Sequence, residues 1–151
     1  VATSLKEVAI PDSVVKIGRS VFDKNVKLKK PAYLKKIKDG SVYYEARATI
    51  KASGKKAVTY KASRITKIKA KTSKVTIQKG KTTKLQTRVY ISKKLKKGYL
   101  DPEILKFTTS NKKVVKVSSK GTIKGLKKGK ATVTVKLRTT GKTYKVNVKV
   151  K

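Results

Sequence analysis

Asp101 and Glu103 are the two acidic residues with the shortest spacing in this chain, since only Pro102 separates them. Paired carboxylates can act as general acid and general base. Here the pair follows Gly98 in a segment typical of a loop, beside several lysines. We therefore interpret these carboxylates as part of a solvated turn that partly offsets nearby positive charge.

The rest of the composition argues against an enzyme. The chain of 151 residues contains no histidine and no cysteine, which excludes the commonest general base and a thiolate nucleophile. The seven carboxylates are scattered, so clustered oxygen ligands for a metal are absent as well. The Gly-Lys pieces do not have the spacing of a P-loop. We expect no catalysis, no metal and no cofactor.

Lysine dominates the charge. There are 43 Lys and Arg against 7 Asp and Glu, for a formal net charge of +36. One interpretation is that lysines form the solvated face of every strand and blunt aggregation at sheet edges. That explains their position but not their excess. The other is attraction to a polyanion: an anionic polymer of the cell wall, an acidic glycan, or nucleic acid.

The kind of cation helps to choose among polyanions. Specific readers of nucleic acid favour arginine for base contacts and aromatic residues for stacking, and both are sparse here. A coat of lysines binds anionic groups as point charges, with strong salt dependence. We therefore rank wall polymer or acidic glycan above nucleic acid, and keep non-specific polyanion binding as the alternative.

The densest lysine group is our candidate polyanion site. It lies in the predicted loop 92–98 and consists of Lys93, Lys94, Lys96 and Lys97. A simple solvated loop is the competing interpretation. Tyr43 and Tyr44 are a second candidate, as a platform for stacking sugars; alternatively, one ring is buried and the other packs at an edge.

These residues need a scaffold, and the C-terminal half predicts one. Apolar and polar residues alternate along 131–138 and along 144–150, which places Val133 and Val146 on buried faces of antiparallel strands. Upstream, 65–80 predicts a broken first strand that ends at Gly80, and 82–91 predicts the second strand. The fold class is all-β, a two-layer sandwich.

The run from Phe107 to Leu137 carries a family resemblance. Paired valines at 114 and 117 precede a turn at Gly121 and a short strand at Ile123. This order is similar to the second half of the bacterial immunoglobulin-like group 2 domain, with Phe107 where that family usually has Trp. The resemblance implies an extracellular, Gram-positive-like cell-surface protein in which the sandwich is a stalk or adhesion module. Another surface protein, of host or bacterium, is a possible partner.

The N-terminal part has a different pattern. Residues 4–22 resemble one BspA-type leucine-rich repeat, with Val21 where that family usually has Ala. One repeat cannot bury its own apolar face, so we expect it to be the last of a longer array; an ordinary strand and loop is the alternative. No apolar stretch could span a bilayer. The absence of Met indicates a processed form or a piece of a longer protein.

The intervening segment is a connector. Residues 23–40 are lysine-dense, with a short helical turn predicted from Tyr33 to Ile37, and Ser53-Gly54 predicts a hairpin. We divide the chain into a leucine-rich-repeat unit (1–30), a connector with a β-hairpin (31–64) and the immunoglobulin-like sandwich (65–151). Whether 41–64 belong to the repeat or to the sandwich stays open. Mutual repulsion predicts a monomer.

Overall fold

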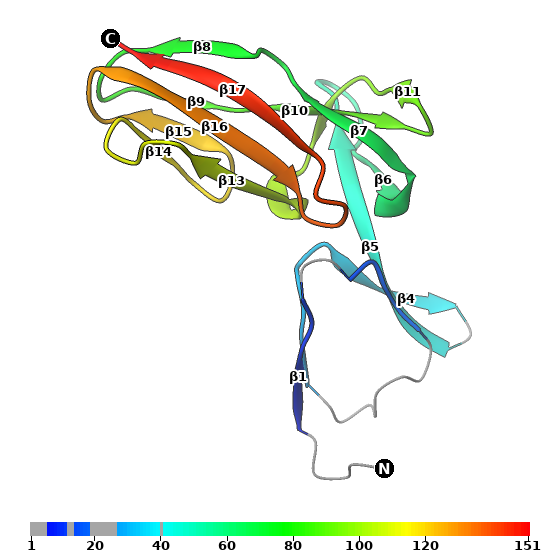
Figure 1. Cartoon of the computed structure of the whole chain (residues 1–151). Helices are drawn as coiled ribbons and strands as arrows, with labels where there is room; N and C mark the ends of the chain where they lie inside the picture. Colours follow the sequence, from blue (N-terminus) through cyan, green and yellow to red (C-terminus); the bar gives the residue numbers. More distant parts are fainter. Residues whose placement is uncertain (1–5, 12–13, 19–26, 40) are drawn as a thin grey trace.

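The computed structural model describes residues 6–11, 14–18, 27–39 and 41–151. Within these residues the regular structure is β, apart from two short 3-10 turns, which confirms the predicted all-β class (Figure 1). The strands are β1 (Glu7–Ala9), β2 (Lys16–Ile17), β3 (Lys27–Lys29), β4 (Leu34–Asp39), β5 (Ser41–Lys51), β6 (Val58–Lys61), β7 (Ile65–Ala70), β8 (Lys74–Ile77), β9 (Thr82–Lys84), β10 (Thr87–Ile91), β11 (Lys94–Leu95), β12 (Tyr99–Leu100), β13 (Leu105–Thr109), β14 (Val115–Val117), β15 (Thr122–Gly125), β16 (Gly129–Leu137) and β17 (Thr143–Val150); the turns are η1 (Ala62–Arg64) and η2 (Pro102–Ile104). No helix in the described part of the chain is long and apolar enough to cross a membrane.

The first layer of the sandwich is the four-stranded sheet β13-β16-β17-β8. Strands β16 and β17 are antiparallel, with Val133 opposite Val146, and both valines are buried as the alternation predicts. Strand β8 runs parallel to β17 along the other edge. The polar residues between the valines point away from the core, because successive side chains of a strand face opposite ways.

The second layer consists of two three-stranded sheets, β11-β10-β7 and β14-β15-β9. The first strand is broken into β7 and β8, as predicted. The predicted second strand, 82–91, is also broken: β9 pairs with β15, whereas β10 pairs with β7. The break falls at Leu85 and Gln86, where the chain changes partner while Leu85 stays buried.

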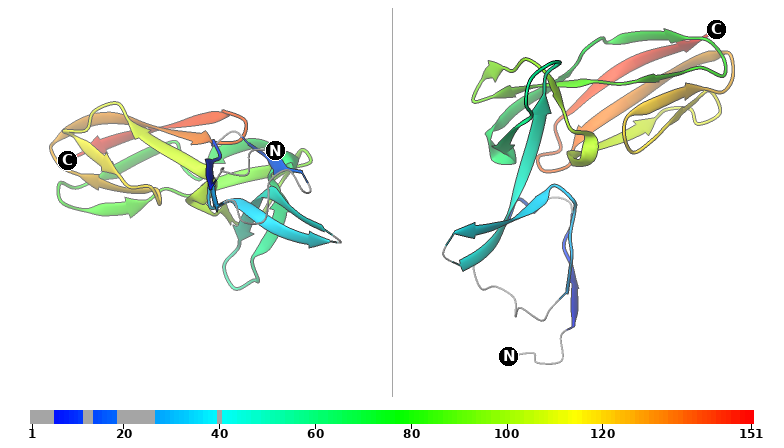
Figure 2. Two further views of the ribbon diagram at one scale, coloured as in Figure 1. Left: turned by 90° about the horizontal axis from the view of Figure 1, so that it is seen from below. Right: turned by 180° about the vertical axis from the view of Figure 1, so that it is seen from behind.

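Strand β5 joins the sandwich to the N-terminal strands. It is eleven residues long, and its first half pairs with β2 and β4, while its second half pairs with β6 and β12 (Figures 1 and 2). The hairpin predicted at Ser53-Gly54 is confirmed as β5–β6. Because β12 pairs with β5, the segment that follows β11 lies against this hairpin.

The helical turn predicted from Tyr33 to Ile37 is wrong, because residues 34–39 form strand β4. Leu34 pairs with Ala46 of β5, and the side chains of Tyr33 and Leu34 are fully buried. Pairing with a long neighbouring strand therefore outweighs the local preference of a lysine-rich segment.

The N-terminal strands β1 and β3 form a separate parallel ladder, in which Glu7 lies opposite Lys27. Val8 and Ile10 are half-buried. Four positions of the repeat-like pattern (Leu5, Ser13, Val21 and Phe22) lie outside the described residues.

Candidate polyanion-binding site

The predicted loop 92–98 contains a short hairpin: Lys93 lies in its turn and Lys94 in β11, whereas Lys96 and Lys97 follow β11. Strands β10 and β11 pair with Ile91 opposite Lys94, so Ser92 and Lys93 form a two-residue turn. Their φ angles are 48° and 71°. This left-handed backbone is what a type I′ hairpin turn requires, and side chains other than Gly, Asn and Asp adopt it at a cost. The Lys93 ammonium therefore projects from a constrained tip.

Neighbouring residues hold this tip in place. The Lys93 amide donates a hydrogen bond to the Thr66 hydroxyl over 3.2 Å, and the Ser92 amide donates to the Arg64 carbonyl over 3.0 Å. The Arg64 guanidinium lies 3.5 Å from the Ser92 hydroxyl. These contacts come from η1 and β7, and they compensate for the strained conformation.

Two tyrosines order the cations around the hairpin. Arg64 and Lys96 lie over the Tyr60 ring, 5.4 Å and 5.6 Å from its centroid, and Lys67 lies 5.8 Å from the centroid of Tyr90. Such distances allow cation–π attraction. Lys96 is accordingly half-buried, whereas Lys93, Lys94 and Lys97 are exposed.

Arg64 and Lys67 join the site only in three dimensions. Arg64 precedes Ser92 by 28 residues, and no spacing in the sequence signals that they meet. The structure thus places the four predicted lysines on the β10–β11 hairpin and the residues that directly follow it, and adds two cations beside them. The hairpin is a cluster of positive charge whose reach toward an anion depends on Lys93, Lys94 and Lys97.

The tyrosine platform is only partly within the described side chains. Tyr44 is half-buried on β5, with the Lys30 ammonium 5.5 Å from its ring centroid. The side chain of Tyr43 lies outside the described residues. Because a cation of the same chain covers Tyr44, its ring has a structural contact already.

The two closely spaced carboxylates have structural partners. Asp101 accepts a hydrogen bond from the Glu103 amide over 3.2 Å and thereby caps η2. Glu103 forms a salt bridge of 3.0 Å with Lys35 of β4. Both are half-buried, and both serve the turn and its contact with the N-terminal strands. Among the described residues no group of acids is arranged to hold a metal.

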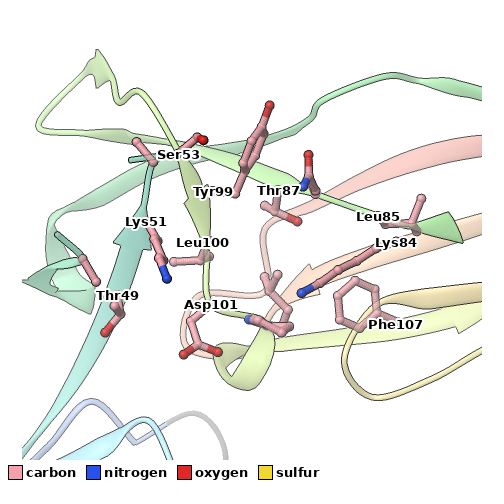
Figure 3. A pocket seen from close by; sticks show the side chains of 15 residues that line it. Thr49, Lys51, Ser53, Lys84, Leu85, Thr87, Tyr99, Leu100, Asp101 and Phe107 are labelled. Atoms are coloured by element: carbon pink, nitrogen blue, oxygen red, sulfur yellow. The ribbon is translucent and has the colours of Figure 1, made fainter. Parts of the chain in front are cut away.

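A cleft of about 540 Å³ lies between the β5–β6 hairpin and the sandwich (Figure 3). Leu85, Leu100 and Phe107 give it apolar walls, and Lys84 extends past Phe107 toward Asp101. Charges of both signs line this cleft. It therefore lacks the uniform positive field of the hairpin.

Comparison with known proteins identifies the fold. Residues 64–148 match the bacterial Ig-like domain (group 2). The chain belongs to this family. No curated protein matches it significantly.

Two solved structures are similar to this group 2 Ig-like chain. One is the S-layer protein SbsC, domains 4 and 5, with 21% sequence identity, a TM-score of 0.46, and coverage of 69% of this chain and 64% of that chain. The other is the S-layer protein rSbsC(31-844), with 20% identity, a TM-score of 0.44, and coverage of 80% of this chain and 19% of that chain. The chain thus spans less than two thirds of either structure.

Phe107 and Gly121 are in close contact within the matched segment. Phe107 of β13 is half-buried, and a side chain built on Gly121 would place its Cβ 2.9 Å from the tip of the Phe107 ring. The φ of Gly121 is +84°, which also favours glycine. This contact joins β13 to the turn before β15, within the segment on which the resemblance was based.

Proposed function

We propose that this chain is a non-catalytic module of a bacterial cell-surface protein, acting as a stalk or adhesion domain, and that its lysine-rich exterior contacts anionic wall polymers or acidic glycans. The group 2 Ig-like fold supports the structural role, and the charge supports the contact. The alternative is a non-specific polyanion-binding protein whose charge alone is the active feature.

The observation that carries the proposal is the shortage of compensating acids on the sandwich, where Asp101 and Glu103 are the only acidic side chains of residues 65–151. The salt bridges of the described residues use Lys29, Lys35, Arg47 and Lys61, which all precede the sandwich. Among the described residues, the exposed lysines of β13, β16 and β17 form no salt bridge with a carboxylate. A mixture of acidic and basic residues would keep the surface equally soluble, so solubility alone does not explain a surface of one charge sign.

The N-terminal residues fit a second part of the proposal. We infer that 1–30 form the terminal unit of a leucine-rich-repeat array, with 31–64 as connector and 65–151 as sandwich. The parallel pairing of β1 with β3, twenty residues apart in Glu7↔Lys27, supports this because stacked repeats pair their strands in parallel. The segment 41–64 contacts both neighbours through β5.

Binding measurements test the proposal. We would measure the affinity of the chain for purified wall teichoic acid, heparin and duplex DNA at physiological salt. The proposal expects wall polymer or heparin to bind more tightly than DNA. Equal affinities for all three would favour the non-specific alternative, and failure of all three to bind would refute polymer contact and leave only the stalk role.

A further inference from the structure

The outer face of the four-stranded sheet carries lysine and short polar residues in register. Four rows cross the strands β13, β16, β17 and β8. From one end of the sheet to the other they are Lys106–Lys136–Thr143, Thr108–Thr134–Lys145, Thr132–Asn147–Lys74 and Lys130–Lys149–Thr76. The lysines in these rows are exposed, and no acid interrupts them. This is the only four-stranded face of the described sandwich, since the other layer is split into two smaller sheets.

Two of these rows place lysines directly opposite each other. Lys106 faces Lys136 between β13 and β16, and Lys130 faces Lys149 between β16 and β17. Like charges opposite each other on neighbouring strands destabilise a sheet. A bound polyanion would remove this repulsion, so the arrangement favours the bound state.

The face is hollowed where the residues are shortest. A trough of about 490 Å³ lies over β8, β16 and β17. Ser110, Thr132 and Asn147 contribute short polar side chains to it, and Lys74, Lys130 and Lys149 stand around them.

The short residues are already ordered by contacts among themselves. The Ser110 hydroxyl accepts a hydrogen bond from the Thr132 amide over 2.8 Å, which leaves its own O–H as a donor. The Thr132 hydroxyl donates to Asn147 Oδ1 over 3.4 Å, which leaves the Asn147 amide nitrogen as a donor. Three lysines and two neutral hydrogen-bond donors thus line one depression.

We propose that this trough binds the phosphate groups of an extended anionic polymer. The proposal rests on the proposed function and assigns polymer contact to the sheet face instead of the β10–β11 hairpin. Lysines surround the trough without arginine. They would hold phosphate groups as point charges, without the bidentate fork that arginine offers to carboxylate and phosphate alike. Neighbouring strands lie about 4.8 Å apart and alternate residues of a strand about 6.8 Å apart, so successive anionic groups of one chain can meet successive lysines.

Two variants with equal loss of charge test the assignment. The trough variant carries Lys74→Gln, Lys130→Gln and Lys149→Gln. The hairpin variant carries Lys93→Gln, Lys94→Gln and Lys97→Gln. All six side chains are exposed, so both variants should fold, which circular dichroism and urea unfolding would verify. The probes are poly(glycerol phosphate) and, as a carboxylate polymer, polygalacturonate, each titrated at several salt concentrations.

We expect the trough variant to bind poly(glycerol phosphate) about tenfold more weakly, and the magnitude of its salt slope to fall by about two, as loss of three contacts to a single-stranded polyanion predicts. The hairpin variant should change affinity less than about threefold. A third variant, Thr132→Val, removes the hydroxyl that orders Asn147 without changing the charge. It should weaken the affinity for poly(glycerol phosphate) more than the affinity for polygalacturonate.

The outcomes separate this inference from the proposed function. Equal losses in the two triple variants, or a larger loss in the hairpin variant, would overturn the trough while leaving polymer contact intact. Tighter binding of polygalacturonate by the unaltered chain would overturn the phosphate assignment. If the unaltered chain binds neither these polymers nor wall teichoic acid and heparin, the proposed polymer contact fails as well.

Discussion

Replacing Gly121 with alanine tests whether the turn before β15 is shaped by Phe107. Two costs add up at this position. With φ at +84°, any L-residue is disfavoured by about 1–2 kcal/mol, partly offset by about 0.4–1 kcal/mol because alanine restricts the unfolded chain. In addition, the new Cβ would lie 2.9 Å from Phe107 Cζ, where carbon atoms prefer about 3.5–4.0 Å. Forcing the ring aside costs about 1–3 kcal/mol, so we expect a total loss of about 2–4 kcal/mol.

Gly80 is the matched control. Its φ is +83°, nearly the same as at Gly121, and a Cβ built there has no neighbour within 4 Å. Gly80→Ala therefore carries only the conformational cost, about 1 kcal/mol. The difference between the two variants isolates the steric part, which we expect to be about 1–3 kcal/mol.

The assay is urea unfolding followed by tyrosine fluorescence, with stability taken from the midpoint at constant slope. A double-mutant cycle completes it, because Phe107→Leu removes the tip of the ring. Gly121→Ala combined with Phe107→Leu should be less destabilised than the sum of the single variants by at least about 1 kcal/mol. Equal losses at Gly80 and Gly121, or additivity in the cycle within about 0.5 kcal/mol, would refute the contact.

Three further predictions concern charge. Glu45 is a buried carboxylate on β5 that lies 3.1 Å from Arg47, so Glu45→Gln should lower the free energy of unfolding in urea by about 1–3 kcal/mol. Glu103 is more exposed, so Glu103→Gln should lower it by less than about 1 kcal/mol. A larger effect at Glu103 than at Glu45 would contradict this reasoning. Burial raises the pKa of Tyr144 above 10.0, against the lowering effect of the Thr87 hydrogen bond. The neutral phenol of Tyr144 therefore contributes its full stability below pH 10, and this contribution is lost as pH rises through the raised pKa. In urea unfolding measured at increasing alkaline pH, the free energy of unfolding should fall more steeply for the unaltered chain than for Tyr144→Phe. Parallel falls in the two proteins would argue against this prediction. Finally, raising NaCl from about 20 mM to about 0.5 M should raise the urea midpoint, because salt screens repulsion between unpaired lysines; an unchanged midpoint would show that repulsion is negligible.

The C-terminal half of the fold could be predicted because each apolar residue has one role there. Val133 and Val146 alternate with polar residues, and only one pairing of faces buries both. The same argument fails for β4 and β11. The local sequence of these lysine-rich segments predicts a loop or a helix. They form strands because β4 pairs with β5 and β11 pairs with β10.

The candidate site was predictable only in its composition. The density of Lys93, Lys94, Lys96 and Lys97 is visible in the sequence, whereas the pairing of Arg64 and Lys96 over Tyr60 depends on where β6, η1 and β11 meet. The burial of Glu45 also has no local signal, because neighbouring strands enclose it.

The alternation of apolar and polar residues does not by itself fix the pairing register of β16 and β17, on which the trough depends. Alternation places every lysine of β16 and β17 outside, since sliding one strand by a single residue would bury lysine. Sliding by two residues keeps the valines buried and changes which polar residues are opposite each other. The turn makes that choice: the Leu137 amide donates to the Lys142 carbonyl, and the Gly141 amide donates to the Leu137 carbonyl, each over 2.8 Å. Those two bonds set Thr132 opposite Asn147 and Lys130 opposite Lys149, so the trough depends on the turn as much as on the residues that form it.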